Sequence, residues 1–208
     1  MTAIEIGRLL RSGTTGCIVG CQINRSPLPA FGELVKVPIN PGETIFGLIY
    51  DIHIDDDGLV RQLATAENIT EEVIQDNRLN RNVPVELSVL FVGYEQGNKV
   101  FHLLPPHPPF SLEKIYTCSE NEICRFTGLQ KNGYLRHIIT RFQEFPAADL
   151  LAAHLKQAAI AQQHSGDPQW TNRAIQEVIT LLRDDYPSLT NVLAALADAD
   201  LVVNPEQV

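Results

Sequence analysis

The stretch of residues 31–52, FGELVKVPINPGETIFGLIYDI, constrains the fold of this chain more than any other part. It contains two β-favouring runs, residues 34–37 and 45–52, with the turn signal Pro41-Gly42 between them. Gly47 interrupts the second run, and a glycine inside a strand usually marks a bulge or a tight bend. Because a small closing barrel needs such bends, we interpret this stretch as a barrel segment.

Further strand-like runs lie on both sides of this segment. They are residues 4–10, 16–23, 85–94 and 99–104. A helix capped by Thr70 and ending by Asn80 is expected as an insertion. Several short strands at close spacing are typical of a small barrel or sandwich. We therefore predict a β-barrel over residues 1–108, with Gly7, Gly32 and Gly47 at its bends.

The Pro-rich segment at residues 104–109 is expected to end the barrel, because prolines cannot donate hydrogen bonds to a sheet. A polyproline ligand for a partner domain is the alternative interpretation of this segment. Residues 109–143 are then predicted to be a connector with short helices. One of these helices should begin at Ser119, which forms a capping-box pattern with Glu122.

Residues 144–208 are rich in alanine and leucine and are predicted to form a three-helix appendage. The helices should begin near Pro146, at Asp167-Pro168 and after the interruption at Tyr186-Pro187. Their apolar stripes are explained by packing against one another, and a face for a partner helix is the alternative. The predicted fold class is α+β: an N-terminal small antiparallel β-barrel followed by a C-terminal helical region.

Charge and hydropathy limit the possible partners. The formal net charge is −9 and is spread along the chain, so neither half has the basic surplus that phosphate binding favours. Nucleic acid is therefore an unlikely partner. No apolar run approaches the roughly 20 residues of a membrane-spanning helix, and the N-terminus has no signal pattern. We expect a cytoplasmic protein with no membrane span.

The cysteines and acidic residues give only weak chemical signals. Cys17 and Cys21 match no zinc pattern and should share one strand face in the core. Cys118 precedes the capped helix, where a thiolate is favoured, but no catalytic partner is placed beside it. The alternating Asp51, His53 and Asp55 fit either a metal site or the solvated face of a strand, and we favour the latter.

The loop at residues 13–16 contains glycine and threonine, as phosphate-binding loops do. It has no lysine to reach phosphates, and β-favouring residues follow it in place of a helix. We therefore predict that the protein neither binds nor hydrolyses ATP. The sequence predicts no catalytic residues, no cofactor-binding residues and no metal ligands.

Three segments, IGRL at residues 6–9, FGELVKV at 31–37 and IFGLIYDI at 45–52, resemble the HAS barrel. This domain is the N-terminal β-barrel of HerA-type DNA-translocating ATPases and rotary ATP synthase subunits. The resemblance covers about residues 4–128 and includes the Pro-rich exit and the capped helix. In that family the barrel assembles rings laterally and docks accessory partners. No Walker A loop follows here, so the resemblance implies the role of the barrel without the motor.

The favoured interpretation is a non-enzymatic docking or assembly module that binds a protein partner or self-associates through its barrel. The long apolar strand at residues 85–94 is a candidate for pairing through an uncovered edge. A single-stranded nucleic-acid-binding barrel is one alternative. A hydrolase of unknown type that uses Cys118 or the Asp51 face is another.

Overall fold

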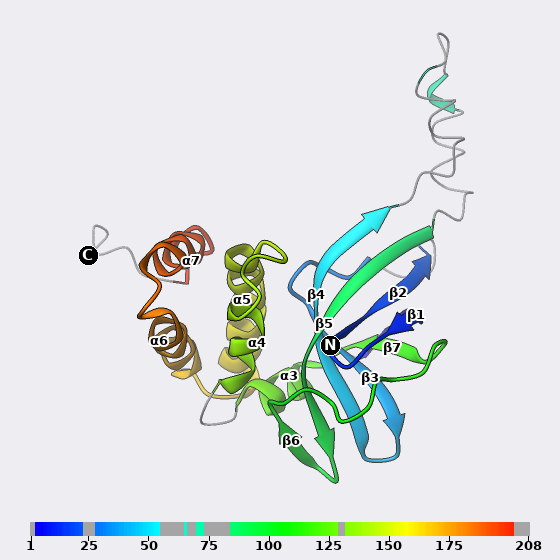
Figure 1. Cartoon of the computed structure of the whole chain (residues 1–208), viewed down its shortest axis with the longest axis horizontal. Helices are drawn as coiled ribbons and strands as arrows, with labels where there is room; N and C mark the ends of the chain where they lie inside the picture. The colour runs from blue at the N-terminus through cyan, green and yellow to red at the C-terminus, as the bar shows by residue number, and fades with distance from the viewer. Residues whose placement is uncertain are drawn as a thin grey trace.

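The computed structural model of the chain describes residues 3–22, 28–54, 65, 70–72, 84–128 and 132–201 (Figure 1). Its strands are β1 (Glu5–Ser12), β2 (Gly16–Gln22), β3 (Leu34–Asn40), β4 (Glu43–Ile54), β5 (Pro84–Gln96), β6 (Lys99–Phe101) and β7 (Lys114–Thr117). Its helices are α3 (Glu120–Thr127), the 3-10 turn η2 (Gly133–Leu135), α4 (Arg136–Ile139), α5 (Ala147–Ser165), α6 (Trp170–Leu182) and α7 (Tyr186–Asp198). Most of the helix expected between Thr70 and Asn80 lies outside the described residues.

Six of the strands form a closed antiparallel barrel. The order around the ring is β2, β1, β7, β3, β4 and β5, and pairing between β5 and β2 closes it. The short strand β6 pairs only with the far end of β5, through a two-residue turn at Gly97 and Asn98 that both have positive φ. The predicted α+β class, with a barrel followed by helices, is confirmed.

Strand β7 was not expected from the sequence. It lies beyond residue 108, where the barrel was predicted to end, and it fills the place between β1 and β3. Its four residues are too few to show an alternating pattern, and Ile115 is its one fully buried side chain. The barrel therefore includes a strand from the segment that was predicted to be a connector.

The barrel interior is a compact apolar core. Its buried side chains come from every strand of the ring: Ile6, Leu9, Cys17, Val19, Cys21, Val35, Val37, Ile45, Ile49, Val85, Leu87, Val89, Phe91 and Ile115. Cys17 and Cys21 share the inward face of β2, as predicted, and burial raises the pKa of Cys17 to about 12. The strand pairing shifts register at Gly7 and Gly47, which are two of the predicted bends.

The outer face of β3, β4 and β5 forms a second core with the helices. Phe126 of α3 packs against Phe46 of β4, with ring centroids 4.7 Å apart. Gly93 makes this approach possible, because a Cβ there would lie 2.7 Å from the Phe126 ring. Helix α3 is thus one of the elements through which the helical region packs on the barrel.

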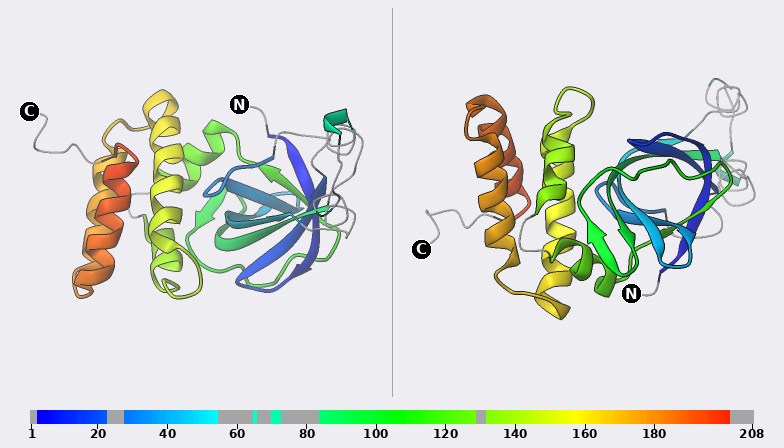
Figure 2. Two further views of the ribbon diagram at one scale, coloured as in Figure 1. Left: turned by 90° about the horizontal axis from the view of Figure 1, so that it is seen from above. Right: turned by 60° about the horizontal axis from the view of Figure 1, so that its bottom comes forward.

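The C-terminal helices continue outward from α3. Figure 2 shows α5 standing between the barrel and the pair α6 and α7. The Trp170 indole of α6 is fully buried and donates to the carbonyl of Thr127 at 2.9 Å. The apolar stripes of the three helices pack against one another within one core, as predicted. None of the described helices has the length and apolarity that a membrane crossing requires.

A buried polar contact joins the barrel to α5. His154 of α5 lies 3.2 Å through Nδ1 from the carbonyl oxygen of Gly32 and 3.0 Å through Nε2 from the hydroxyl of Tyr134. Because a carbonyl only accepts, Nδ1 carries the proton and Nε2 accepts from Tyr134. Both bonds are satisfied by a neutral imidazole. Burial lowers the pKa of His154 to about 4, since the charged form loses its solvation.

This contact predicts that the free energy of unfolding decreases in mild acid. The unfolded histidine takes up a proton near pH 6.5, whereas His154 in the folded protein resists protonation down to about pH 4. The contribution of neutral His154 to the free energy of unfolding is therefore fully present above pH 6.5. It falls by on the order of 3 kcal/mol as the pH drops from 6.5 to about 4. Urea titrations of wild type, His154→Gln and the control His164→Gln, at an exposed position near the end of α5, check this. An unchanged pH slope in His154→Gln contradicts it.

The close packing of α5 on Gly32 predicts that alanine substitution destabilises the protein more at Gly32 than at Gly42, although the two glycines share one backbone conformation. Gly32 and Gly42 both have φ of +80°, but only at Gly32 would a Cβ meet other atoms closely, at 2.7 Å from Ala153 Cβ. We expect Gly42→Ala to cost about 1 kcal/mol through backbone strain alone. Gly32→Ala should cost about 3 kcal/mol or more, because overpacking adds to that strain. Equal costs in denaturant unfolding would show that the barrel and α5 are not packed as described.

Candidate docking surface

Residues 105–113, here called the strap, run along β1 on the outside of the barrel. The backbone of Leu112 donates to Leu9 at 2.8 Å, and the backbone of Leu9 donates to Glu113 at 3.0 Å. Side chains add to this attachment: Arg8 donates to the carbonyl of Leu112 at 2.9 Å, and Ser12 donates to that of Pro109. The strap is therefore fixed to the barrel through both backbone and side chains.

The fixed strap presents large apolar side chains to solvent. Phe110 is 78% exposed and Leu112 is 67% exposed, and Leu10 on the adjacent β1 is 48% exposed. Single exposed hydrophobic residues are common on protein surfaces, but several of them on one hydrogen-bonded segment and the strand beside it are typical of an interaction site. We call Leu10, Phe110 and Leu112 the apolar patch.

The backbone of Leu112 adopts an unfavourable conformation. Its φ of +70° lies in the left-handed region, which a branched side chain such as leucine rarely enters. The cost is about 1–2 kcal/mol, and the hydrogen bonds of Leu112 with Leu9 and Arg8 hold it there. Strain of this kind accumulates where a function requires a given orientation. The exposed leucine is thus held in place at some cost to stability.

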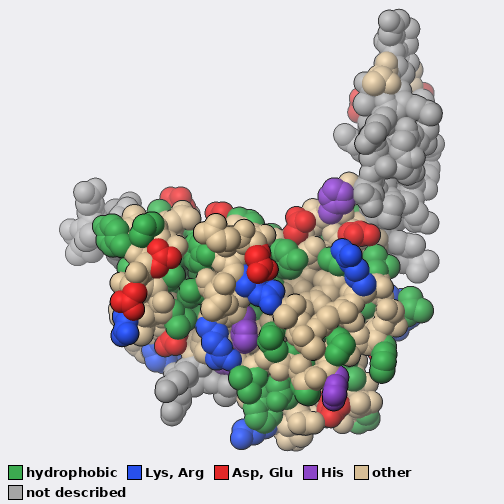
Figure 3. All heavy atoms as spheres, viewed as in Figure 1, with side chains coloured by type: hydrophobic (Ala, Val, Ile, Leu, Met, Phe, Trp, Pro, Cys, Tyr) green, Lys and Arg blue, Asp and Glu red, His purple; other side chains and the backbone are tan. Residues whose placement is uncertain are grey.

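A groove of about 390 Å³ lies beside the strap at one end of the barrel. Three prolines of the strap and Phe110 line it together with Ile39 and Tyr94 of the barrel; the prolines are Pro105, Pro106 and Pro108. Tyr94 stacks on Phe101 of β6 with ring centroids 5.0 Å apart. Figure 3 shows hydrophobic side chains gathered over the β6 end of the barrel. The groove extends the apolar patch around the end of the barrel.

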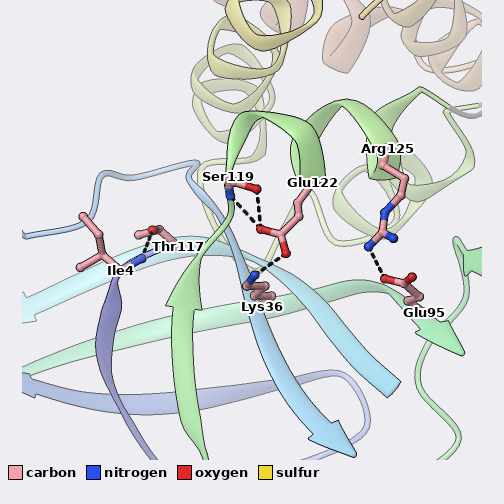
Figure 4. A network of polar contacts seen from close by, with 7 residues as sticks. All are labelled: Ile4, Lys36, Glu95, Thr117, Ser119, Glu122 and Arg125. Atoms are coloured by element: carbon pink, nitrogen blue, oxygen red, sulfur yellow. Dashed lines mark hydrogen bonds and ion pairs between the residues drawn. The ribbon is translucent and has the colours of Figure 1, made fainter. Parts of the chain in front are cut away.

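Ion pairs engage Lys36 and Lys114 on the barrel surface and Arg125 on α3. Figure 4 shows Lys36 of β3 bound to Glu122 of α3, and Arg125 of α3 bound to Glu95 of β5. Glu122 also accepts from the backbone amide of Ser119 at 2.9 Å, so the predicted helix start is confirmed. These contacts fix α3 to the barrel. They also leave Lys36 and Arg125 without the free charge that a nucleic-acid groove requires.

The predicted weak activation of Cys118 is wrong. Its side chain is buried between the barrel and the helices, and burial together with the Glu122 carboxylate raises the pKa of the thiol well above its usual range. Although α3 begins just after Cys118, desolvation outweighs any stabilisation of the thiolate by the helix. The structure gives Cys118 the properties of a core residue.

The other chemical candidates do not form a site either. Asp51 and His53 are exposed on β4, as expected for a solvated face, and Asp55 lies outside the described residues. Within the described parts of the chain, no three His, Cys, Asp or Glu side chains are grouped to hold a metal ion. The loop at residues 13–16 joins β1 to β2 and leads into a strand, as predicted.

The expected association through an edge of β5 has to be corrected. Residues of β5 pair with β4 along one edge, and the other edge pairs with β2 and then with β6. Because the barrel closes, this long apolar strand offers no free backbone groups to a second chain. Exposed side chains, such as those of the apolar patch, are therefore the candidates for a docking surface beside β5.

No protein-family model matches the chain, and a search of curated proteins found no match. A function is therefore inferred from the patch and its attachment. The sequence analysis did not find Phe110 or Leu112, because they follow the prolines in a segment that has no periodic pattern. A phenylalanine and a leucine within a turn-rich segment were the only available signal.

The burial of Cys118 predicts that its thiol does not react in the native protein. We expect a thiol reagent to modify Cys118 only as fast as the protein unfolds, because the thiolate is both desolvated and inaccessible. Mass spectrometry of peptides from native and denatured samples measures the rate at each cysteine. Modification of native Cys118 at the rate of the denatured protein would show that the thiol is accessible and would support the alternative of a hydrolase that uses it.

Proposed function

We propose that this protein is a non-enzymatic docking or assembly module of the cytoplasm, which binds a protein partner or a second copy of itself through its barrel. The resemblance to the HAS barrel supports this, since the barrels of that family assemble rings and dock partners. A closed barrel with exposed apolar side chains suits the same role. The apolar patch on the strap is the surface that we assign to the contact.

The rigid exposure of Phe110 and Leu112 carries this proposal. Burying such a side chain in an interface contributes about 1.5–3 kcal/mol. Binding a partner costs little entropy for ordering these residues, because the hydrogen bonds of Leu112 already fix the strap. Aromatic and aliphatic anchors held in this way are typical of interface hot spots.

The alternatives have less support. Every described Lys and Arg on the barrel except Arg11 has a carboxylate, a carbonyl or a ring as its partner, and the chain carries a net charge of −9. This disfavours nucleic acid, whose binding depends on free cations. A hydrolase needs an accessible nucleophile with a base beside it. Cys118 is buried and meets neither condition.

The proposal predicts that two substitutions in the strap abolish association. Phe110→Ser removes the aromatic anchor, and Leu112→Asn removes the second apolar group while suiting the left-handed backbone. Light scattering at tens of micromolar, in moderate salt and after nuclease treatment, should show assembly of the wild type or a stable complex with a co-purified protein. The double variant should remain a 23.1 kDa monomer.

The matched control is Tyr186→Ser on α7, because Tyr186 is 76% exposed and lies away from the barrel. This variant should associate like the wild type. The double variant should unfold at a temperature no lower than that of the wild type, since Leu112→Asn relieves strain. A wild type that is monomeric and retains no partner contradicts the proposal. Association that survives in the double variant contradicts the assigned surface.

A further inference from the structure

A second cavity, of about 340 Å³, lies between the barrel and the segment that connects α4 to α5. The loop at residues 13–16 and the adjoining ends of β1 and β2 form one side. Arg141, Glu144 and Phe145 form the other side, and Tyr50 of β4 lies within it. Small-ligand sites have similar volumes and often lie between structural units, with apolar walls and a few polar groups.

The cavity concentrates positive charge in an acidic protein. Arg11 and Arg141 both line it, and Glu144 is the one carboxylate among its lining residues. Among the described Lys and Arg residues, Arg11 is the one whose side chain forms no ion pair, hydrogen bond or ring contact with another described residue. Arg141 is paired with Glu144 at 3.6 Å, and that carboxylate is 63% exposed. Two guanidinium groups and one carboxylate leave a formal charge of +1 to be balanced.

The remaining donors suit a carboxylate better than a phosphate. The amide of Gly13 already donates to the carbonyl of Gly16, and the hydroxyl of Ser12 already donates to Pro109. The amide of Gly13 is therefore not available to a ligand, and strand β2 follows the loop in place of the helix N-terminus that holds a dianion in phosphate-binding loops. The guanidinium groups of Arg11 and Arg141 are the cationic donors of the cavity, and the geometry of each matches the two oxygens of a carboxylate. A single negative charge also balances the formal charge of +1.

Part of the wall of the cavity is apolar and aromatic. The rings of Tyr50 and Phe145 are in contact, with centroids 5.1 Å apart, and both are partly buried. Ile18 and Leu90 add aliphatic surface from β2 and β5. A ligand that places its carboxylate at the arginines can therefore bury a ring or an aliphatic body against this wall.

We propose that this cavity binds a small organic monocarboxylate with an aromatic or aliphatic body. The site is separate from the docking function proposed above, and either can be wrong without the other. Arg11 and Arg141 bind the carboxylate, while Tyr50 and Phe145 hold the apolar body. ATP is not such a ligand, in agreement with the prediction from the loop sequence.

Titration of the ¹⁵N-labelled protein with phenylacetate, followed by NMR, tests this site. We expect saturable shifts at the amides of Gly13, Gly16 and Cys17, with a dissociation constant of about 1 mM or lower. Phenylacetamide has the same shape without the charge and should give no saturable shifts. Phenyl phosphate should bind more weakly than phenylacetate, because the formal charge of +1 left by Arg11, Arg141 and Glu144 does not balance a dianion.

Substitutions of the arginines complete the test. Arg11→Gln and Arg141→Gln should each weaken phenylacetate binding about tenfold or more, and Arg183→Gln at the end of α6 is the matched control that should not. Arg11 is exposed, so its replacement keeps the fold even if replacement of Arg141 disturbs it. The proposal is overturned if phenylacetate gives no saturable shifts up to about 20 mM. It is equally overturned if phenylacetamide binds as well, or if Arg11→Gln binds like the wild type.

Discussion

The contact between Gly32 and His154 is the constraint on which the rest of the structure depends. Gly32 has no side chain, so α5 can approach the start of β3 until the imidazole reaches the carbonyl of Gly32. Tyr134 satisfies the other ring nitrogen, so the polar group is buried without an unpaired atom. The outer face of the barrel and the helices therefore share one core, and the helical region is an integral part of the fold.

This packing determines which surfaces remain available for function. The helices cover the outer face of β3 to β5, and closure of the ring consumes the edges of β5. The side of β1 stays open and bears the strap with its apolar patch. Ser12 connects the two proposed sites, since it lines the carboxylate cavity and also donates to Pro109 of the strap. The docking surface thus lies on the part of the barrel that the helices leave uncovered, and the carboxylate cavity lies next to it, where the α4–α5 segment meets the barrel.

Local patterns in the sequence were sufficient for much of the fold. Gly47 predicted a bend, Ser119 and Glu122 predicted a helix start, and the alanine-rich segment predicted three packed helices, because each of these signals acts over a few neighbouring residues. Strand β7 could not be predicted from local sequence, because its pairing with β1 and β3 depends on residues far away in the chain. The positive φ of Leu112 and the meeting of Arg11 with Arg141 in one cavity are likewise products of tertiary structure. No pattern in the sequence indicates them.

Photo-crosslinking from the strap tests the central claim most directly. A photoreactive phenylalanine analogue at position 110 replaces one aromatic ring by another at the centre of the apolar patch. On irradiation of the assembled protein, we predict a cross-link from position 110 to a second copy or to a co-purified partner, and none from the same analogue at position 186. Equal cross-linking from both positions, or none from position 110 while the assembly persists, would contradict the assignment of the docking surface.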